Sequence, residues 1–142
     1  MTDLLELERR YYAALNARDF DAYDTFFADD VLIEAPGVTA HGLEAMREFD
    51  RGWMTAFPDA RITIERQAAD AAVVLSENRI TGTHDGILRG PGGEIPPTGR
   101  TLDERYAVVL EAEGGKFTTF RIHYDGLTLL TRLGLMPDAA AV

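Results

Sequence analysis

The sequence of 142 residues contains no cysteine, which excludes disulfide bonds, thiolate nucleophiles and cysteine-based metal sites. It also lacks any apolar run that approaches the roughly 20 residues needed for a membrane-spanning helix. The first ten residues, MTDLLELERR, have neither the basic start nor the apolar core of a secretory signal peptide. We therefore expect a cytoplasmic protein with no membrane contact.

Positive charge is scarce as well. The chain has 14 Lys and Arg against 24 Asp and Glu, a formal net charge of −10. Nucleic acids and anionic membrane surfaces are bound by basic patches, so we expect neither as a partner. The three histidines, His41, His84 and His123, lack the close spacing of zinc sites, and we expect no metal. The segment RGPGGE (residues 89–94) lacks the GK[ST] ending of a phosphate loop and does not open a helix, so we expect no phosphate-binding loop there.

Hydrophobic residues make up 46% of the chain, enough for one core, so we expect a single domain over residues 1–142. Helical spacing predicts helices first, and alternating patterns predict strands later. The expected helices cover residues 3–17, 19–30, 42–57 and, at the end, 126–134; the expected strands cover residues 31–36, 60–68, 71–86, 100–113 and 117–125.

Helices followed by long antiparallel strands are typical of an α+β domain, in which helices cover one face of a curved sheet. Such a bent sheet encloses a pocket, and concave places of this kind bind small ligands. The segment RGPGGEIPPTGR (residues 89–100) is dense in Gly and Pro and is expected to form a loop at the rim of that pocket.

The last expected strand carries an unusual alternation. Phe120, Ile122 and Tyr124 share one parity, and Arg121, His123 and Asp125 share the other. If Asp125 faces the pocket, Arg121 and His123 should line the same wall. Asp125 also directly precedes an apolar helical segment, where it would serve as an N-cap. Both interpretations of Asp125, helix cap and cavity carboxylate, stay open at this point.

The opening segment NARDFDAYDTFFADDVLIEAPG (residues 16–37) is similar to the helix–helix–strand start found across a known superfamily. Three later segments carry a closer resemblance to one family within it: TGTHDGIL (residues 81–88), IPPTGR (residues 95–100) and DGLTLLTRLGLMP (residues 125–137). In this order they resemble the SnoaL-like polyketide cyclases, or ester cyclases, of the superfamily that includes nuclear transport factor 2 and ketosteroid isomerase. The resemblance implies a cone-shaped, curved antiparallel (mixed) sheet with three N-terminal helices and a short C-terminal helix around a pocket.

The resemblance also implies an activity. It suggests a cofactor-free intramolecular aldol ring closure of a polyketide-like or other small apolar carbonyl substrate. Asp125 matches the family's general acid/base carboxylate, and His84 matches the histidine of its GTH segment. Asp85 departs from the family, which usually has a small hydroxyl residue there. His123 is a second helper that would orient or polarise the substrate.

Arg121, Trp53, Phe49 and Tyr11 are the further candidates for substrate binding. A carboxylate in water, with a pKa of about 3.9, is a weak base for carbon acids, so we expect aromatic walls to raise the pKa of Asp125. A neighbouring Arg121 would oppose that shift.

Three alternatives remain from the sequence. The chain could be an isomerase or dehydratase, an epoxide hydrolase in which Asp125 and Arg121 activate water, or a non-catalytic ligand-binding domain. The family resemblance also implies a homodimer or larger homo-oligomer formed through the outer face of the sheet. The apolar run YAVVL (residues 106–110) fits a strand that is buried on both faces.

Overall fold

The computed structural model describes residues 3–90 and 92–136, so both ends of the predicted domain lie outside the described residues. The helical elements are α1 (Leu4–Asn16), the short 3₁₀ helix η1 (Phe20–Thr25), α2 (Leu43–Ala56) and α3 (Gly126–Arg132). The strands are β1 (Phe27–Ala35), β2 (Val38–His41), β3 (Arg61–Ala69), β4 (Val73–Thr83), β5 (Leu88–Gly90), β6 (Gly93–Ile95), β7 (Thr101–Glu113) and β8 (Lys116–His123).

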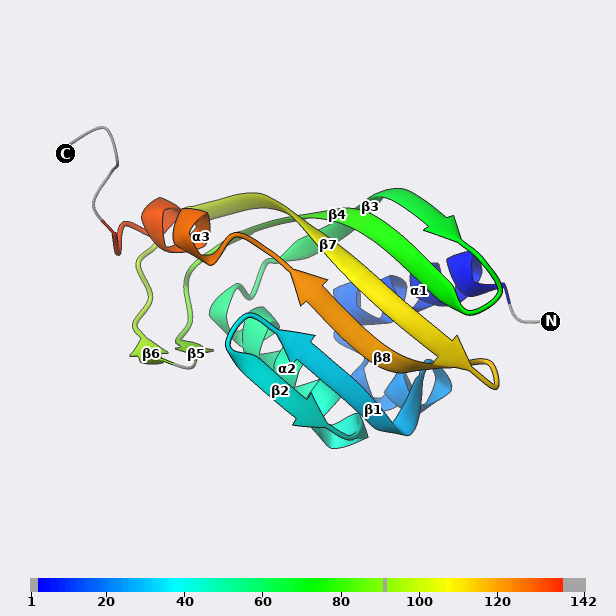
Figure 1. Cartoon of the computed structure of the whole chain (residues 1–142). Coiled ribbons are helices and arrows are strands. Elements are labelled where there is room, and N and C mark those ends of the chain that lie inside the picture. Colours follow the sequence, from blue (N-terminus) through cyan, green and yellow to red (C-terminus); the bar gives the residue numbers. More distant parts are fainter. Residues whose placement is uncertain (1–2, 91, 137–142) are drawn as a thin grey trace.

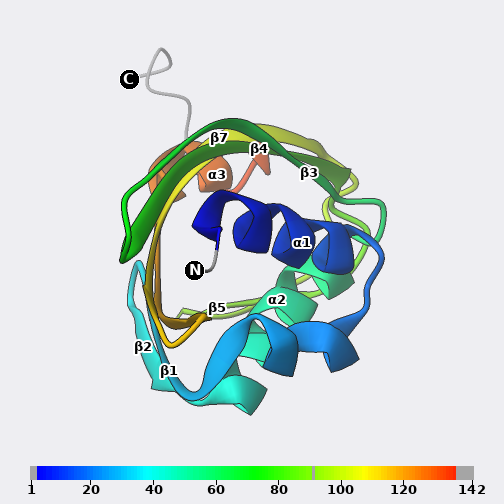
Figure 2. The ribbon, with the colours of Figure 1, turned by 90° about the vertical axis from the view of Figure 1, so that its right-hand side faces the viewer.

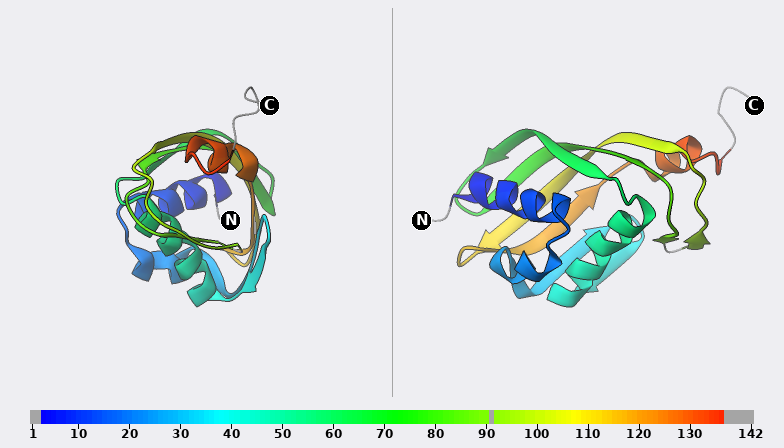
Figure 3. Two further views of the ribbon diagram at one scale, coloured as in Figure 1. Left: turned by 90° about the vertical axis from the view of Figure 1, so that its left-hand side faces the viewer. Right: turned by 180° about the vertical axis from the view of Figure 1, so that it is seen from behind.

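Six strands form one strongly curved sheet in the order β2-β1-β8-β7-β4-β3 (Figure 1). The pair β1–β8 is parallel and the other neighbours are antiparallel, which makes the sheet mixed. Figure 2 shows the sheet curling around α1, and the view from behind in Figure 3 shows α1 and α2 on its concave side. The α+β prediction with a curved sheet and covering helices is confirmed.

Helix α1 shows how local sequence sets these elements. The Asp3 carboxylate oxygen Oδ1 accepts the backbone N–H groups of Leu5 at 3.1 Å and Glu6 at 3.3 Å, which is the N-cap arrangement. Leu7 and Tyr11 recur one helical turn apart and are buried against the sheet. The cap and the apolar stripe together fix where α1 begins and which face it turns inward.

Four strands were not predicted correctly. Strand β1 begins at Phe27, four residues earlier than expected, and β2 and the β5–β6 hairpin were not predicted at all. The acidic residues at the start of β1 have low strand propensity, but β1 is hydrogen-bonded to β8, which comes about 90 residues later in the chain. Such distant pairing overrides a local pattern. His41 ends β2 and is exposed, as a strand residue rather than part of a turn.

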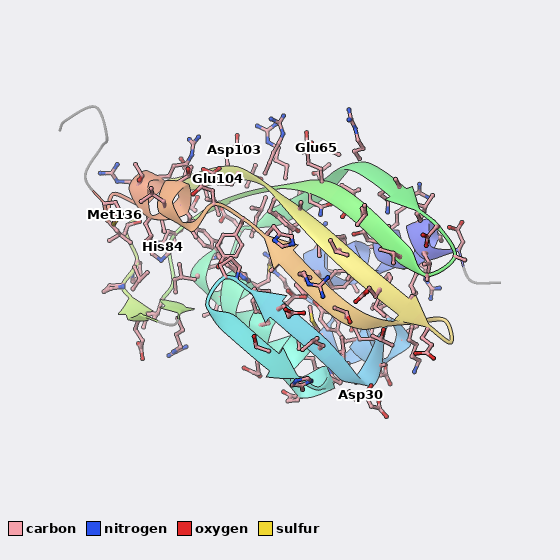
Figure 4. All side chains as sticks on the ribbon, viewed as in Figure 1. Asp30, Glu65, His84, Asp103, Glu104 and Met136 are labelled. Carbon is pink, nitrogen blue, oxygen red and sulfur yellow. The ribbon has the colours of Figure 1, made fainter. Side chains whose placement is uncertain are left out.

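The outer face of the sheet is largely charged and exposed. Arg79 donates to Asp103 through two hydrogen bonds, Nε to Oδ1 at 2.7 Å and Nη2 to Oδ2 at 2.6 Å. Arg105 Nε donates to Glu65 Oε1 at 2.7 Å, and Figure 4 shows Asp103 and Glu65 on this face. Within the protomer Ala107 is exposed, so the 106–110 segment is not buried on both faces. Oligomerisation through this face stays a prediction.

Candidate active site

A cavity lies between the concave face of the sheet, the helices α1 and α2, and α3. Its volume, measured as the space open to the centre of a water molecule, is about 60 Å³. This is several times the roughly 10–15 Å³ that one water molecule requires by the same measure. Its walls are mostly aromatic and aliphatic. The lining residues are Tyr11, Tyr12, Leu15, Phe49, Asp50, Trp53, Met54, Ile62, Ile80, Leu102, Glu104, Arg105, Tyr106, Phe120, Ile122, Tyr124, Asp125 and Leu129.

Two aspartates lie at opposite depths of this cavity. Asp125 is exposed and marks the mouth, whereas Asp50 is only 4% exposed and marks the floor. The Tyr11 hydroxyl donates to Asp50 Oδ2 at 2.7 Å, and the Tyr23 hydroxyl donates to the same oxygen at 2.6 Å. Neither tyrosine engages the other carboxylate oxygen, Oδ1. Burial raises the pKa of Asp50 to about 6, although the two hydrogen bonds act in the opposite direction.

Asp50 reaches the cavity because of its position in α2. Met46, Asp50 and Met54 follow one another at intervals of four residues, and all three are buried on the inner side of the helix. The sequence interpretation overlooked Asp50. The available signal was its position: Asp50 stands at helical spacing between two apolar residues of a buried stripe. Burying a carboxylate there costs free energy unless other side chains donate hydrogen bonds to it.

Asp125 is the N-cap of α3. Its Oδ1 accepts the backbone N–H of Thr128 at 3.0 Å, and its Oδ2 accepts the Thr128 hydroxyl at 2.6 Å. These hydrogen bonds hold the pKa of the exposed Asp125 below its usual value. The expectation that aromatic walls raise this pKa is therefore wrong, because the carboxylate lies at the open mouth. Asp125 is both a helix cap and a cavity-lining residue.

The inner face of β8 is the opposite of the one expected. Phe120 and Ile122 line the cavity, followed by Tyr124 just beyond the strand, whereas Arg121 and His123 point to the outer face and His123 is exposed. Arg121 Nη2 donates to Glu34 Oε1 of β1 at 3.0 Å. The prediction that both residues share a wall with Asp125 is wrong, because β8 ends at His123 and the chain then turns toward α3. Strand parity does not extend to residue 125.

His84 is fully buried but does not line the cavity. Its Nδ1 lies 2.9 Å from Thr98 Oγ1 and accepts the Thr98 backbone N–H at 3.3 Å. Its ring packs on Phe57 at a centroid distance of 5.2 Å, and burial lowers its pKa. Backbone hydrogen bonds from His84 to Arg100 and from Gly99 to His84 close the same contact. Figure 4 shows His84 near α3 and the β5–β6 hairpin. The structure thus joins the TGTH and PPTGR segments to each other and leaves His84 outside the lining of the cavity.

The remaining aromatic candidates do line the cavity. Tyr11 belongs to its floor, and Phe49 and Trp53 form a wall from α2. The Phe49 ring meets Phe120 edge-on at 5.7 Å, and the Trp53 ring meets Tyr124 edge-on at 5.6 Å. These contacts join α2 to the end of β8 and leave an apolar, aromatic surface on this side of the cavity.

Comparison with known proteins decides the family. The family model described as SnoaL-like polyketide cyclase matches residues 5–133. The chain belongs to this family. A search of curated protein sequences finds no match.

Solved structures share the fold. A candidate SnoaL-like polyketide cyclase from Jannaschia sp. CCS1 is 19% identical, with a TM-score of 0.83 over 94% of this chain and 92% of the other. A SnoaL-like polyketide cyclase from Agrobacterium tumefaciens is 25% identical, with a TM-score of 0.77 over 94% and 100%. AclR, a candidate hydroxylase from Streptomyces galilaeus, is 24% identical, with a TM-score of 0.78 over 94% and 82%.

This SnoaL-like chain buries a further carboxylate, Glu8 of α1. Ser76 Oγ donates to Glu8 Oε2 at 2.6 Å, and Gln67 Nε2 donates to Oε1 at 2.8 Å. Burial raises the pKa of Glu8. Both oxygens are engaged and Glu8 does not line the cavity. Its hydrogen bonds therefore hold α1 against β3 and β4, a structural role that distinguishes it from Asp50.

Over residues 3–90 and 92–136, no three or more His, Asp or Glu side chains are grouped so that they could hold a metal ion. No helix within the same described part is long and apolar enough to cross a membrane.

Proposed function

We propose that this chain is a cofactor-free cyclase that closes a ring in a polyketide-like or other small apolar carbonyl substrate by an intramolecular aldol reaction. The observation that carries the proposal is a cavity with apolar, aromatic walls and one aspartate at each depth. Membership of the SnoaL-like family supports the same reaction class. An enzyme of this kind needs no more than a base, an acid and a dry surface that positions the substrate.

Asp125 is the proposed base. Its lowered pKa keeps it ionised at neutral pH, as a base must be, but makes it a weaker base than an ordinary carboxylate until a substrate binds. The proton leaves a carbon next to a carbonyl group, and the resulting enolate carbon forms a bond to a second carbonyl carbon. The new alkoxide then takes up one proton, so that the reaction is an isomerisation with no net proton exchange. A substrate in the mouth would displace water from Asp125 and strengthen it as a base.

The test is Asp125→Asn, assayed by chromatographic detection of the ring-closed product from a polycyclic ketone with a methyl-ester side chain. Asparagine is also a favoured N-cap, so the fold is expected to persist. We expect turnover to fall by about 100-fold or more, the usual contribution of a positioned base. Asp24→Asn, at an exposed position of η1, is the matched control and should retain full turnover. Undiminished turnover in Asp125→Asn would refute the role of Asp125.

Non-catalytic ligand binding is the second candidate. The satisfied hydrogen bonds and low pKa of Asp125 favour it, because a plain helix cap has the same features. A binder would retain its ligand affinity in Asp125→Asn and show no ring closure in any variant. The epoxide hydrolase alternative loses support, since Arg121 pairs with Glu34 on the outer face and is unavailable to Asp125.

The predicted homodimer is a separate question, and light scattering would measure the oligomeric state.

A further inference from the structure

Asp50 is the one buried carboxylate, among the described residues, that lines the cavity. The two tyrosines approach it from separate elements, Tyr11 from α1 and Tyr23 from η1, and both donate to Oδ2. An aspartate built into an apolar stripe is expensive to bury unless it is hydrogen-bonded. The two hydrogen bonds to Oδ2 fix the orientation of the carboxyl group. They leave Oδ1 available to interact with a ligand in the cavity.

We propose that Asp50 is the proton donor to the oxygen of the bound carbonyl group, with Oδ1 carrying the proton and the Tyr11 and Tyr23 hydroxyls stabilising the carboxylate that forms. This inference rests on the proposed function and extends it: the ligand enters with a carbonyl oxygen at its inner end. It assigns the two aspartates different tasks, Asp125 as the base at the mouth and Asp50 as the acid at the floor.

The proton balance closes with these two groups. Asp125 accepts the proton from carbon, and the carbon–carbon bond forms as the attacked carbonyl π bond breaks. Asp50 Oδ1 transfers its proton to the alkoxide oxygen, which becomes a hydroxyl group. Asp125 is then neutral and Asp50 is ionised. Asp125 returns its proton to solvent at the mouth, and Asp50 regains one from water when the product leaves, so that no oxidant or co-reactant is required.

The environment of Asp50 agrees with a role as proton donor. Environments that move two carboxyl pKa values apart separate acid from base, and here burial raises the pKa of Asp50 while hydrogen bonding lowers that of Asp125. No positively charged side chain contributes to the pKa of Asp50. The titratable and charged groups that surround the cavity are Tyr11 and Tyr12 from α1, Tyr23 from η1, Glu104, Arg105 and Tyr106 from β7, and Tyr124 and Asp125 after β8. The Arg105 side chain donates to Glu65 on the outer face of the sheet.

Binding of a matched pair of small probes tests the proposal without any turnover. The probes are 1-indanone, which has a carbonyl group, and indane, which has a methylene group in its place. Trp53 is the single tryptophan of the chain and lines the cavity, so its fluorescence reports binding directly. Affinity for 1-indanone should be constant below the pKa of Asp50 and fall by about tenfold per pH unit above it. Affinity for indane should not change with pH.

Variants separate a proton donor from a merely structural carboxylate. In Asp50→Asn the affinity for 1-indanone should become independent of pH, because the amide does not titrate. Tyr23→Phe removes a hydrogen bond that favours the ionised form, so the fall should begin at a higher pH. Tyr12 also lies in the cavity wall but is not hydrogen-bonded to Asp50. Tyr12→Phe should therefore not change the pH at which the affinity for 1-indanone begins to fall.

Each outcome decides one of the two proposals. A pH-independent affinity for 1-indanone in the unmodified protein overturns the role of Asp50, as does a fall that persists in Asp50→Asn. Ring closure that survives in Asp50→Asn also overturns that role and leaves the cyclase proposal standing. If the unmodified protein shows no ring closure but binds 1-indanone with the expected pH dependence, the cyclase proposal fails. The proposal that Asp50 donates to a bound carbonyl oxygen is then retained.

Discussion

The two ends of the cavity place the same functional group in contrasting environments. At the floor, Asp50 is buried and accepts two tyrosine hydroxyls on one oxygen, and its pKa is raised. At the mouth, Asp125 is exposed and bonded to Thr128, and its pKa is lowered. Hydrogen bonds favour the charged form in both places, so desolvation is what separates the two aspartates. Depth within the cavity, rather than residue type, decides which of them has the higher pKa.

The largest effect is expected from Asp50→Asn on stability at about pH 8. Since burial raises the pKa of Asp50 from 3.8 to about 6, the folded state binds this proton more tightly than the unfolded state. Stability therefore decreases as pH rises through this interval, by about 3 kcal/mol in total. Asparagine keeps an oxygen for both tyrosines and carries no charge.

Urea denaturation of Asp50→Asn should accordingly show a higher free energy of unfolding than the unmodified protein at about pH 8, and nearly the same value at about pH 4. Asp24→Asn is the control for the loss of one negative charge. If Asp50→Asn and the unmodified protein are equally stable at both pH values, burial does not raise the pKa of Asp50 and the prediction is wrong.

A smaller effect is expected from Tyr23→Phe. The hydroxyl of Tyr23 donates to a charged acceptor at about pH 8, and such hydrogen bonds contribute about 1.5–3 kcal/mol. At about pH 4 the carboxyl group is neutral and the loss should shrink to about 1 kcal/mol. The measurement is again urea denaturation, with Tyr12→Phe for comparison. A loss that does not depend on pH would mean that Tyr23 stabilises the core only by packing.

The smallest effect is expected at the mouth, from Asp125→Ala. The substitution removes the N-cap of α3, so thermal stability should decrease slightly, whereas Asp125→Asn should preserve it. Because the pKa of Asp125 is lowered on folding, its contribution should be present above the unfolded pKa and disappear as pH falls through the folded value. Thermal melts of both variants followed by circular dichroism would show this. Equal melting of Asp125→Ala and the unmodified protein would remove the capping role.

The sequence predicts well what depends on local periodicity. Helices α1 and α2 and the long strands β3, β4, β7 and β8 follow apolar patterns that extend over whole elements. It fails where partners are distant, as for the start of β1, which depends on pairing with β8. It also fails where a pattern ends. Strand β8 ends at His123, so the alternation of faces cannot be extended to Asp125, and Arg121 pairs with Glu34 on the outer face instead of lining the cavity.

The site was harder to predict than the fold for a related reason. The most telling group, Asp50, stands inside an apolar stripe, and its tyrosine partners lie 39 and 27 residues away in sequence. No local pattern joins these three residues. Tyr11, Phe49 and Trp53 could be named because aromatic residues on the inner faces of helices tend to meet a pocket when the sheet is curved.

The contact between His84 and Thr98 has a consequence for any mutational survey of this chain. His84 is fully buried and joins the end of β4 to the segment at Thr98, 14 residues later in the chain, so most replacements there would reduce the amount of folded protein. A screen scored by activity alone would rank His84 beside the aspartates of the cavity. A parallel measure of protein abundance would separate a loss of folded protein from a loss of catalysis at His84.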